Sequence, residues 1–300
     1  MKKTVISLLA LALTMTAEAQ TKDSIDTAQF AVVYDYSLNT LDDEGKEVCD
    51  SIQVVVQVGQ KVTKSLPMTS YLKETQKVKI QGMDMADYRK RLSVEHIETL
   101  THMPTVWTNY PEGETTVREV IFPRKFEGYE PTQKLTWKLS TDTLHISGYL
   151  CSRAETTFRG IRWEVWYTEE IPSSAGPWRL HGLPGLIVKA TSEAHSFTLT
   201  ELYHENTAIT YETDIKIERM KYPKLLKYRQ EVLGSKLYAK NPLHHLPNNN
   251  SMTLNQDFFM TAGITNVYVI NNENGEGGYI IADNLHMLQK AHVYQPLEKK

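Results

Sequence analysis

The sequence predicts a mainly β protein: a curved antiparallel sheet or half-barrel, bowl-like in shape, with one or two covering helices. Short runs of β-branched, aromatic and alternating residues recur along the chain, and turn residues separate them. The densest series of such runs spans residues 133–168. The hydrophobic fraction of 41% and the charged fraction of 23% are ordinary for a globular protein. Short strands joined by short turns indicate an antiparallel meander.

The first strands are predicted at residues 28–36 and 49–59. In the second of them apolar and polar residues alternate, which predicts a single buried face. The residues expected on that face are Ile52, Val54, Val56 and Val58. Residues 86–100 repeat at helical intervals and predict a helix, which Pro104 would end.

Five further strands are predicted in the middle of the chain, at residues 105–110, 115–122, 133–139, 141–158 and 161–168. The last of these has two clearly different faces. One face is expected to carry Ile161, Trp163, Val165 and Tyr167, and the other Arg162, Glu164, Trp166 and Thr168.

The later part of the chain predicts a hairpin at residues 186–191 and 195–203, and then a helix at 224–238. From residue 241 the chain turns polar, although residues 264–270 can add a strand. Three regions follow from this pattern. They are a signal peptide at 1–19, a β domain at 20–240 and a polar C-terminal extension at 241–300.

The N-terminus has the pattern of a secretory signal peptide. Lys2 and Lys3 precede an apolar run, residues 4–16, that is too short to span a bilayer, and Ala17–Ala19 offers an A-x-A cleavage site. The alternative is a buried N-terminal helix. Cleavage after Ala19 would leave a mature chain without a transmembrane segment, in the periplasm or secreted.

Export would place Cys49 and Cys151 where disulfides form, so these two residues are a candidate disulfide. The alternative is two separate buried thiols. Neither cysteine has a second ligand at the spacing of a zinc site, and no cofactor-binding motif is present, so neither metal nor cofactor is predicted. The net charge of -3 argues against a nucleic-acid partner, which needs a basic surface.

The tryptophans predict a hollow in the sheet. Trp163 and Trp166 lie on one strand at an odd spacing, so they cannot both point inward. One face of the strand is therefore expected to line a concavity or to contact another layer. An apolar hollow in a curved sheet suits a lipid, a peptide or a glycan.

Residues 181–187, HGLPGLI, predict a type II turn at Leu183–Leu186. Proline presets the backbone angle at Pro184, Gly185 accepts the positive φ of the next position, and Gly182 frees the approach. The favoured interpretation is a structural turn. In the functional alternative, a lip contacts a ligand or partner, formed by Trp166, Trp178, His181, Leu183 and Leu186. Catalysis through the histidine lacks a neighbouring nucleophile motif such as G-x-S-x-G.

Residues 148–190 closely resemble the signature of the GLPGLI family of exported bacterial proteins. The matching parts are Gly148-Tyr149, Cys151, Ala154, Phe158-Arg159-Gly160, Trp166-Tyr167-Thr168, Ile171-Pro172, Gly176-Pro177 and Gly182 through Ile187. The segments WTNYPEGETTV and QVVVQVG are also similar to the family, and the resemblance runs from about residue 28 to 240. The sequence departs from the family pattern at Ile161, where arginine is usual, and Arg162 follows one position later.

This family is largely uncharacterised, so the resemblance implies a cellular location more than an activity. Its members are exported by bacteria with two membranes, and their genes often lie near TonB-dependent outer-membrane receptors. The resemblance also implies a bowl-shaped β module similar to the non-catalytic N-terminal part of a secreted peptide-N-glycosidase. It supplies no known active site.

Several functions remain open from the sequence. The absence of a catalytic motif favours a non-enzymatic envelope protein that binds a small apolar ligand, a peptide or an outer-membrane partner. A periplasmic hydrolase on peptide or glycan would need a histidine and a carboxylate in one pocket, whereas a purely structural component would need no concavity. A copper-binding protein would use Met83, Met85, His96, His102 and Met103. His244 and His245 are expected to be solvated loop residues.

Overall fold

The computed structural model describes residues 21–42, 44–75, 103–121, 124–213, 217–234, 267–271, 278–282 and 293–299. Within these ranges the chain is mainly β, as predicted. Twelve of the described strands form one large sheet. Its two end strands, β8 and β14, do not pair with each other, so the sheet is curved and open rather than a closed barrel.

Neighbouring strands of the large sheet are antiparallel, except for the parallel pair β14 and β7. In spatial order the strands are β14 (Glu218–Lys221), β7 (Arg124–Pro131), β6 (Glu114–Ile121), β5 (Thr105–Thr108), β4 (Thr63–Pro67), β3 (Glu47–Val58), β2 (Phe30–Leu41), β12 (His195–His204), β11 (Leu186–Thr191), β10 (Ile161–Thr168), β9 (Tyr149–Phe158) and β8 (Lys138–Ile146). Two small antiparallel sheets pair β1 (Thr21–Thr27) with β13 (Ala208–Thr213), and β15 (Val267–Asn271) with β16 (Gly278–Ala282).

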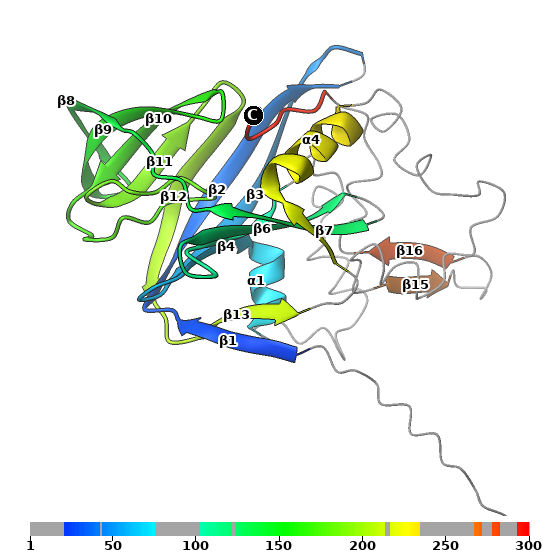
Figure 1. Cartoon of the computed structure of the whole chain (residues 1–300). Coiled ribbons are helices and arrows are strands. Elements are labelled where there is room, and N and C mark those ends of the chain that lie inside the picture. Colours follow the sequence, from blue (N-terminus) through cyan, green and yellow to red (C-terminus); the bar gives the residue numbers. More distant parts are fainter. Residues whose placement is uncertain are drawn as a thin grey trace, which may run out of the picture.

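The large sheet has two wings that meet at the long strands β2 and β3 (Figure 1). Strands β8 to β12 form one wing, and strands β4 to β7 form the other. Both wings contribute side chains to one buried cluster, for example Val117 and Phe126 from the second wing and Trp163 and Phe197 from the first. The wings therefore share a single core on the concave side of the sheet.

Two described helices cover the sheet. Helix α1 (Met68–Glu74) packs on β3 and β4, and helix α4 (Tyr222–Leu233) packs on β6, β7 and β14. Helix α4 has proline in its first turn, where the missing N–H costs nothing. It confirms the predicted helix as far as Leu233, whereas the helix predicted at residues 86–100 lies outside the described residues.

Strand β3 differs from its prediction because both of its faces are buried. Val54, Val56 and Val58 enter the main core as expected, but Val55 packs in a second cluster with Ala31, Leu66 and Tyr71. Helix α1 lies against this second face, and the period-2 pattern of one strand does not reveal such a cover. The strand predicted at residues 133–139 is also wrong in extent, since β8 begins only at Lys138.

The alternation predicted for β10 is confirmed. The inward face, with Ile161, Trp163, Val165 and Tyr167, is buried. On the other face Arg162 is exposed and Glu164 and Trp166 are partly buried, whereas Thr168 at the end of the strand is buried. The hairpin of β11 and β12 also lies where the sequence predicts it.

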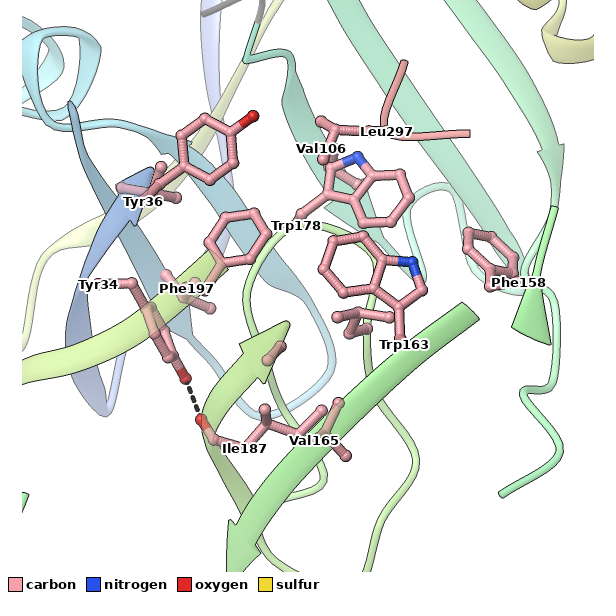
Figure 2. Packing of buried hydrophobic residues seen from close by; sticks show 14 of the residues in the cluster. Tyr34, Tyr36, Val106, Phe158, Trp163, Val165, Trp178, Ile187, Phe197 and Leu297 are labelled. Carbon is pink, nitrogen blue, oxygen red and sulfur yellow. Dashed lines mark hydrogen bonds between the residues drawn. The ribbon is translucent and has the colours of Figure 1, made fainter. Parts of the chain in front are cut away.

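The hollow of the curved sheet is filled by the chain itself. The segment 169–185 leaves β10, and its Trp178 enters the core (Figure 2), with ring centroids 5.8 Å from Trp163 and 5.6 Å from Phe158. The Trp178 backbone N–H donates to Ser65 Oγ on β4 of the opposite wing at 3.1 Å. Tyr34 of β2 donates its hydroxyl to the Ile187 carbonyl at 2.6 Å. The Ser65 contact ties the connecting segment to the opposite wing, and the Tyr34 contact ties β2 to β11.

The GLPGLI motif owes its two glycines to different constraints, which corrects the predicted type II turn. Gly182 has a φ of 93°, whereas Gly185 is not among the residues with positive φ. A side chain at Gly185 would put its Cβ 2.0 Å from the Thr168 carbonyl oxygen, so the backbones of the segment and of β10 touch there. Glycine is needed at this position for close approach and not for a left-handed angle.

Replacing Gly185 by alanine is expected to destabilise the fold far more than replacing Gly182. The Cβ at Gly185 would collide with backbone that cannot move alone, which should cost about 3 kcal/mol or more. At Gly182 the added Cβ would lie 3.8 Å from its nearest neighbour, so the cost is that of the backbone angle, about 1 kcal/mol. Urea unfolding of both variants measures the difference. Equal losses would contradict the close-approach explanation.

The predicted disulfide is not formed. Cys49 on β3 is exposed and Cys151 on β9 is buried, and both thiols are free. Strands β2, β12, β11 and β10 lie between β3 and β9 in the sheet, whereas a disulfide needs Cα atoms within about 7 Å. Burial raises the pKa of the Cys151 thiol, so this residue packs as a small apolar side chain.

Candidate functional site: a cavity beside the C-terminal strap

A cavity of about 470 Å³ lies beside the last described segment of the chain. We call that segment, residues 293–299, the strap; in Figure 1 it is the red trace between the β8–β12 wing and α4. Three stretches line the cavity. They are Gly160 with the start of β10 (Ile161, Arg162, Glu164), the turn between β11 and β12 (Thr191–His195), and strap residues Gln295, Pro296 and Lys299.

The register of the sheet places these stretches together. Glu164 of β10 pairs with Thr191 at the end of β11, and the turn from Ser192 to His195 then begins β12. In this turn the Ser192 N–H donates to the His195 carbonyl at 2.8 Å. The strap closes the remaining side because the Lys299 N–H donates to the Arg159 carbonyl at 2.8 Å.

Charges of both signs line the cavity. Arg162 pairs with Glu155 at 2.8 Å and Glu164 pairs with Arg153 at 2.6 Å, so these two side chains already have partners on the sheet. Among the residues that the structure describes, Glu193 and Lys299 make no ion pair. Both residues line the cavity and are exposed, so their charges remain free to pair with a ligand.

His195 forms the floor of the cavity and is fully engaged. Its Nε2 lies 3.1 Å from the Pro296 carbonyl oxygen, and its Nδ1 lies 2.9 Å from the Tyr36 hydroxyl. Because a carbonyl oxygen only accepts, Nε2 carries the proton and Nδ1 accepts from Tyr36. The imidazole also stacks on Trp163, with ring centroids 6.2 Å apart. This histidine joins the strap to the core rather than presenting a free base.

Lowering the pH is expected to destabilise the protein through His195. Its pKa is lowered from 6.5 to about 4, first by burial and further by the nearby charge of Arg229, despite the bond to Pro296. The unfolded chain takes up this proton near pH 6.5 and the folded chain only near pH 4, so stability is complete above pH 6.5 and falls between these values. The loss should be about 3 kcal/mol.

The measurement is the unfolding free energy at pH 7, 5.5 and 4 for the wild type and for His195→Gln. Carboxylates titrate in both proteins, so the comparison isolates the histidine. The wild type should lose more stability than the variant over this range, and parallel profiles would contradict the assignment.

Next to the cavity, two arginines and two glutamates form a closed ring of buried ion pairs. Glu130 at the end of β7 contacts both Arg159 and Arg179. Glu298 of the strap contacts the same two arginines, Arg159 Nε at 3.1 Å and Arg179 Nη1 at 3.0 Å. None of the four side chains is more than 9% exposed. The strap thus supplies one of the four charged side chains in this cluster.

Aromatic side chains pack against the ring of ion pairs. The Arg179 guanidinium lies 4.7 Å from the centre of the Tyr222 ring and 5.1 Å from that of Phe158, and the Tyr222 hydroxyl donates to Glu298. Burial alone would lower the pKa of Arg179, but the carboxylates of Glu298 and Glu130 raise it. Burial and Glu298 raise the pKa of Tyr222 well above its usual value, so its hydroxyl stays a donor.

The residues predicted to bind a ligand do not line this cavity. Trp178, Leu183 and Leu186 are buried in the core, and Trp166 lies partly buried on the outer face of β10. His181 bonds through Nδ1 to the Arg179 carbonyl at 2.9 Å, and burial lowers its pKa. In the motif, Gly182 and Pro184 are exposed and Gly185 is buried.

The residues that form the site were missed, although two of them carry a signal in the sequence. Arg179 stands between Trp178 and Leu180, and a charge between large apolar residues indicates a buried ion pair. His195 starts a strand whose alternate residues are apolar, which places it on the inward face. Glu298 stands in a short polar stretch without a pattern.

Of the residues predicted to bind copper, Met83, Met85, His96 and His102 lie outside the described part of the chain. The same holds for His244 and His245. In the described ranges, no three histidine, cysteine, aspartate or glutamate side chains are grouped so as to hold a metal ion. Neither α1 nor α4 is long and apolar enough to cross a lipid bilayer.

Comparisons with known proteins bear on the segment that ends at the motif. Residues 156–189 match the model of Porph_ging, described as a protein of unknown function. No curated protein matches the chain. Two solved structures of PNGF-II, in space groups P21 and C2, are 16% identical over 67% and 66% of this chain, with TM-scores of 0.43 and 0.40. The match spans 32% of the length of those chains, about a third.

Proposed function

We propose that this chain is an exported, non-enzymatic envelope protein that binds a short peptide in the cavity beside the strap. The observation that carries the proposal is that an acidic and a basic residue both line that cavity. Glu193 carries a carboxylate and Lys299 an ammonium group, and both residues line the cavity. An unblocked peptide carries the complementary ammonium and carboxylate, while a purely apolar ligand would leave both charges unpaired.

The cavity volume suits a ligand of this size, since small-molecule sites usually measure about 300–1,000 Å³. The apolar hollow that the sequence predicts for a lipid, a peptide or a glycan is instead occupied by the chain's own Trp178. This arrangement supports a polar ligand over a lipid.

The hydrolase alternative draws no support from the described part of this cavity. It requires a histidine that can act as a base beside a carboxylate. Both ring nitrogens of His195 are bound, to Tyr36 and to Pro296, and its lowered pKa makes it a poor base. A binding role uses the same residues without demanding that His195 be released.

Export and membership of the GLPGLI family are part of the proposal. The signal-peptide pattern at residues 1–19 supports export, and the long motif at 148–190 overlaps the stretch 156–189 that matches Porph_ging. As this resemblance implies, we propose that the peptide belongs to, or is delivered to, an outer-membrane receptor of the TonB-dependent class.

Native mass spectrometry of the protein purified from its own envelope tests this function. We expect a retained species whose fragmentation yields amino acids. Glu193→Lys should lose it, because the cavity then repels the peptide ammonium group. The matched control is Glu169→Lys, which changes the same charge at an exposed turn outside the cavity. A retained lipid or glycan, or a peptide kept equally by both variants, would contradict the proposal.

A further inference from the structure

The strap is held in the manner of a bound peptide. It forms no strand, and its backbone is fixed by separate hydrogen bonds to several elements. The Val293 N–H donates to the Leu41 carbonyl at 2.7 Å, Thr40 Oγ1 donates to the Val293 carbonyl at 2.5 Å, and Gln230 Nε2 donates to the Glu298 carbonyl at 3.2 Å. We call the residues that contact the strap its seat, namely Thr40, Leu41, Arg159, Arg179, His195, Tyr222 and Gln230.

The seat selects two adjacent side chains of the strap. Leu297 enters the main core at 3% exposure, and Glu298 enters the ring of ion pairs at 1%. Val293 and Lys299, at the two ends, are exposed. An apolar residue followed by a carboxylate is therefore the feature that the seat recognises, with two arginines and the Tyr222 hydroxyl on the carboxylate.

Pro296 adds a third requirement. Its carbonyl accepts from His195, and proline needs no partner for a backbone N–H. The proline ring fixes the backbone φ just before the Leu297–Glu298 pair. The seat consequently fits an extended segment in which proline is followed by an apolar residue and then by an acidic residue.

We propose that the seat is a second peptide-binding site, for an extended segment with an apolar residue followed by a carboxylate, and that the strap is its resident, exchangeable occupant. The inference rests on the proposed function in taking a peptide as partner, but the seat shares only His195 with the lining of the cavity. Because Gln295, Pro296 and Lys299 line the neighbouring cavity, release of the strap would also open that cavity.

Because the strap and a free peptide compete for the seat, binding of the peptide is easiest to detect when the strap binds more weakly. A segment on the same chain competes at an effective concentration on the order of millimolar. A free peptide of the same sequence therefore binds only weakly to the wild type, in which the strap occupies the seat. When the strap lacks its two anchoring side chains, the same peptide should bind at least tenfold more tightly.

The experiment uses the full chain with Leu297→Ala and Glu298→Gln combined, and a fluorescent synthetic peptide of residues 291–300, AHVYQPLEKK. Fluorescence anisotropy should show at least tenfold tighter binding than to the wild type. The same peptide carrying L297A and E298Q should not gain affinity. The matched control chain is Val293→Ala, which alters an exposed strap side chain and should behave as the wild type.

A second measurement applies if the double variant does not fold, as judged by circular dichroism. Wild-type protein is mixed with millimolar isotope-labelled peptide, and hydrogen exchange is followed in the strap, whose Lys299 N–H is bonded to Arg159. The matching peptide should speed exchange of the strap at least tenfold, and the L297A/E298Q peptide should not.

Each of the two proposals can be contradicted without contradicting the other. Glu193→Lys should abolish the ligand retained in the cavity without altering peptide exchange at the seat. If a folded double variant binds neither peptide, or both equally, or if the wild-type strap exchanges at one rate with either peptide, the seat is a structural contact and the inference is wrong. That result would leave the cavity and its ligand untouched.

Discussion

Replacing Arg179 by methionine is expected to lower the free energy of unfolding by about 3–5 kcal/mol. The arginine stands between Glu130 and Glu298, both buried, and its removal leaves the two carboxylates to share Arg159. A buried charge that loses its partner keeps its full cost of desolvation, while methionine preserves the length of the side chain. Urea denaturation at pH 7 measures the loss.

Arg162→Met is the matched control for this prediction. Arg162 is 73% exposed and makes one ion pair, with Glu155, so its loss should change stability little. Adding Glu130→Gln and Glu298→Gln to Arg179→Met removes the stranded charges and should restore part of the stability. If Arg179→Met costs no more than Arg162→Met, the ring of ion pairs does not stabilise the strap and the core as described.

Replacing Trp178 by alanine is expected to cost about 3–5 kcal/mol, because it opens a void in the centre of the shared core. Its ring contacts both Trp163 and Phe158, and its backbone N–H reaches β4 of the opposite wing. The same substitution at Trp166, on the outer face of β10, should cost clearly less. Thermal unfolding of the two variants provides the comparison, and equal losses would contradict a filled hollow.

The alternation of side chains carried most of the fold prediction. Strand β10 shows why it worked: one face is buried in the core and most of the other is more exposed, so apolar and polar residues alternate along the strand. Strand β3 shows where prediction from side-chain alternation fails. Val55 is buried by helix α1, which lies elsewhere in the chain, and no local pattern reports a cover of that kind.

The candidate site was much harder to predict than the fold. Tryptophans and a Pro-Gly motif suggested a hollow, yet the segment carrying Trp178 fills that hollow. The site arises instead from residues more than a hundred positions apart, such as Arg179 and Glu298. Pairing such charges requires the three-dimensional arrangement, since Glu298 stands in a stretch with no periodicity. The GLPGLI motif itself marks a close backbone contact at Gly185.

The most direct test of the peptide-binding account is a titration of isotope-labelled protein with unblocked trialanine, followed by nuclear magnetic resonance. The account predicts shifts confined to the backbone amides of residues 191–195 and Lys299. The doubly blocked form, N-acetyl-trialanine amide, should produce none, because it lacks the charges that Glu193 and Lys299 would bind. Equal shifts with both forms, or shifts centred on Trp166 and residues 176–187, would contradict it.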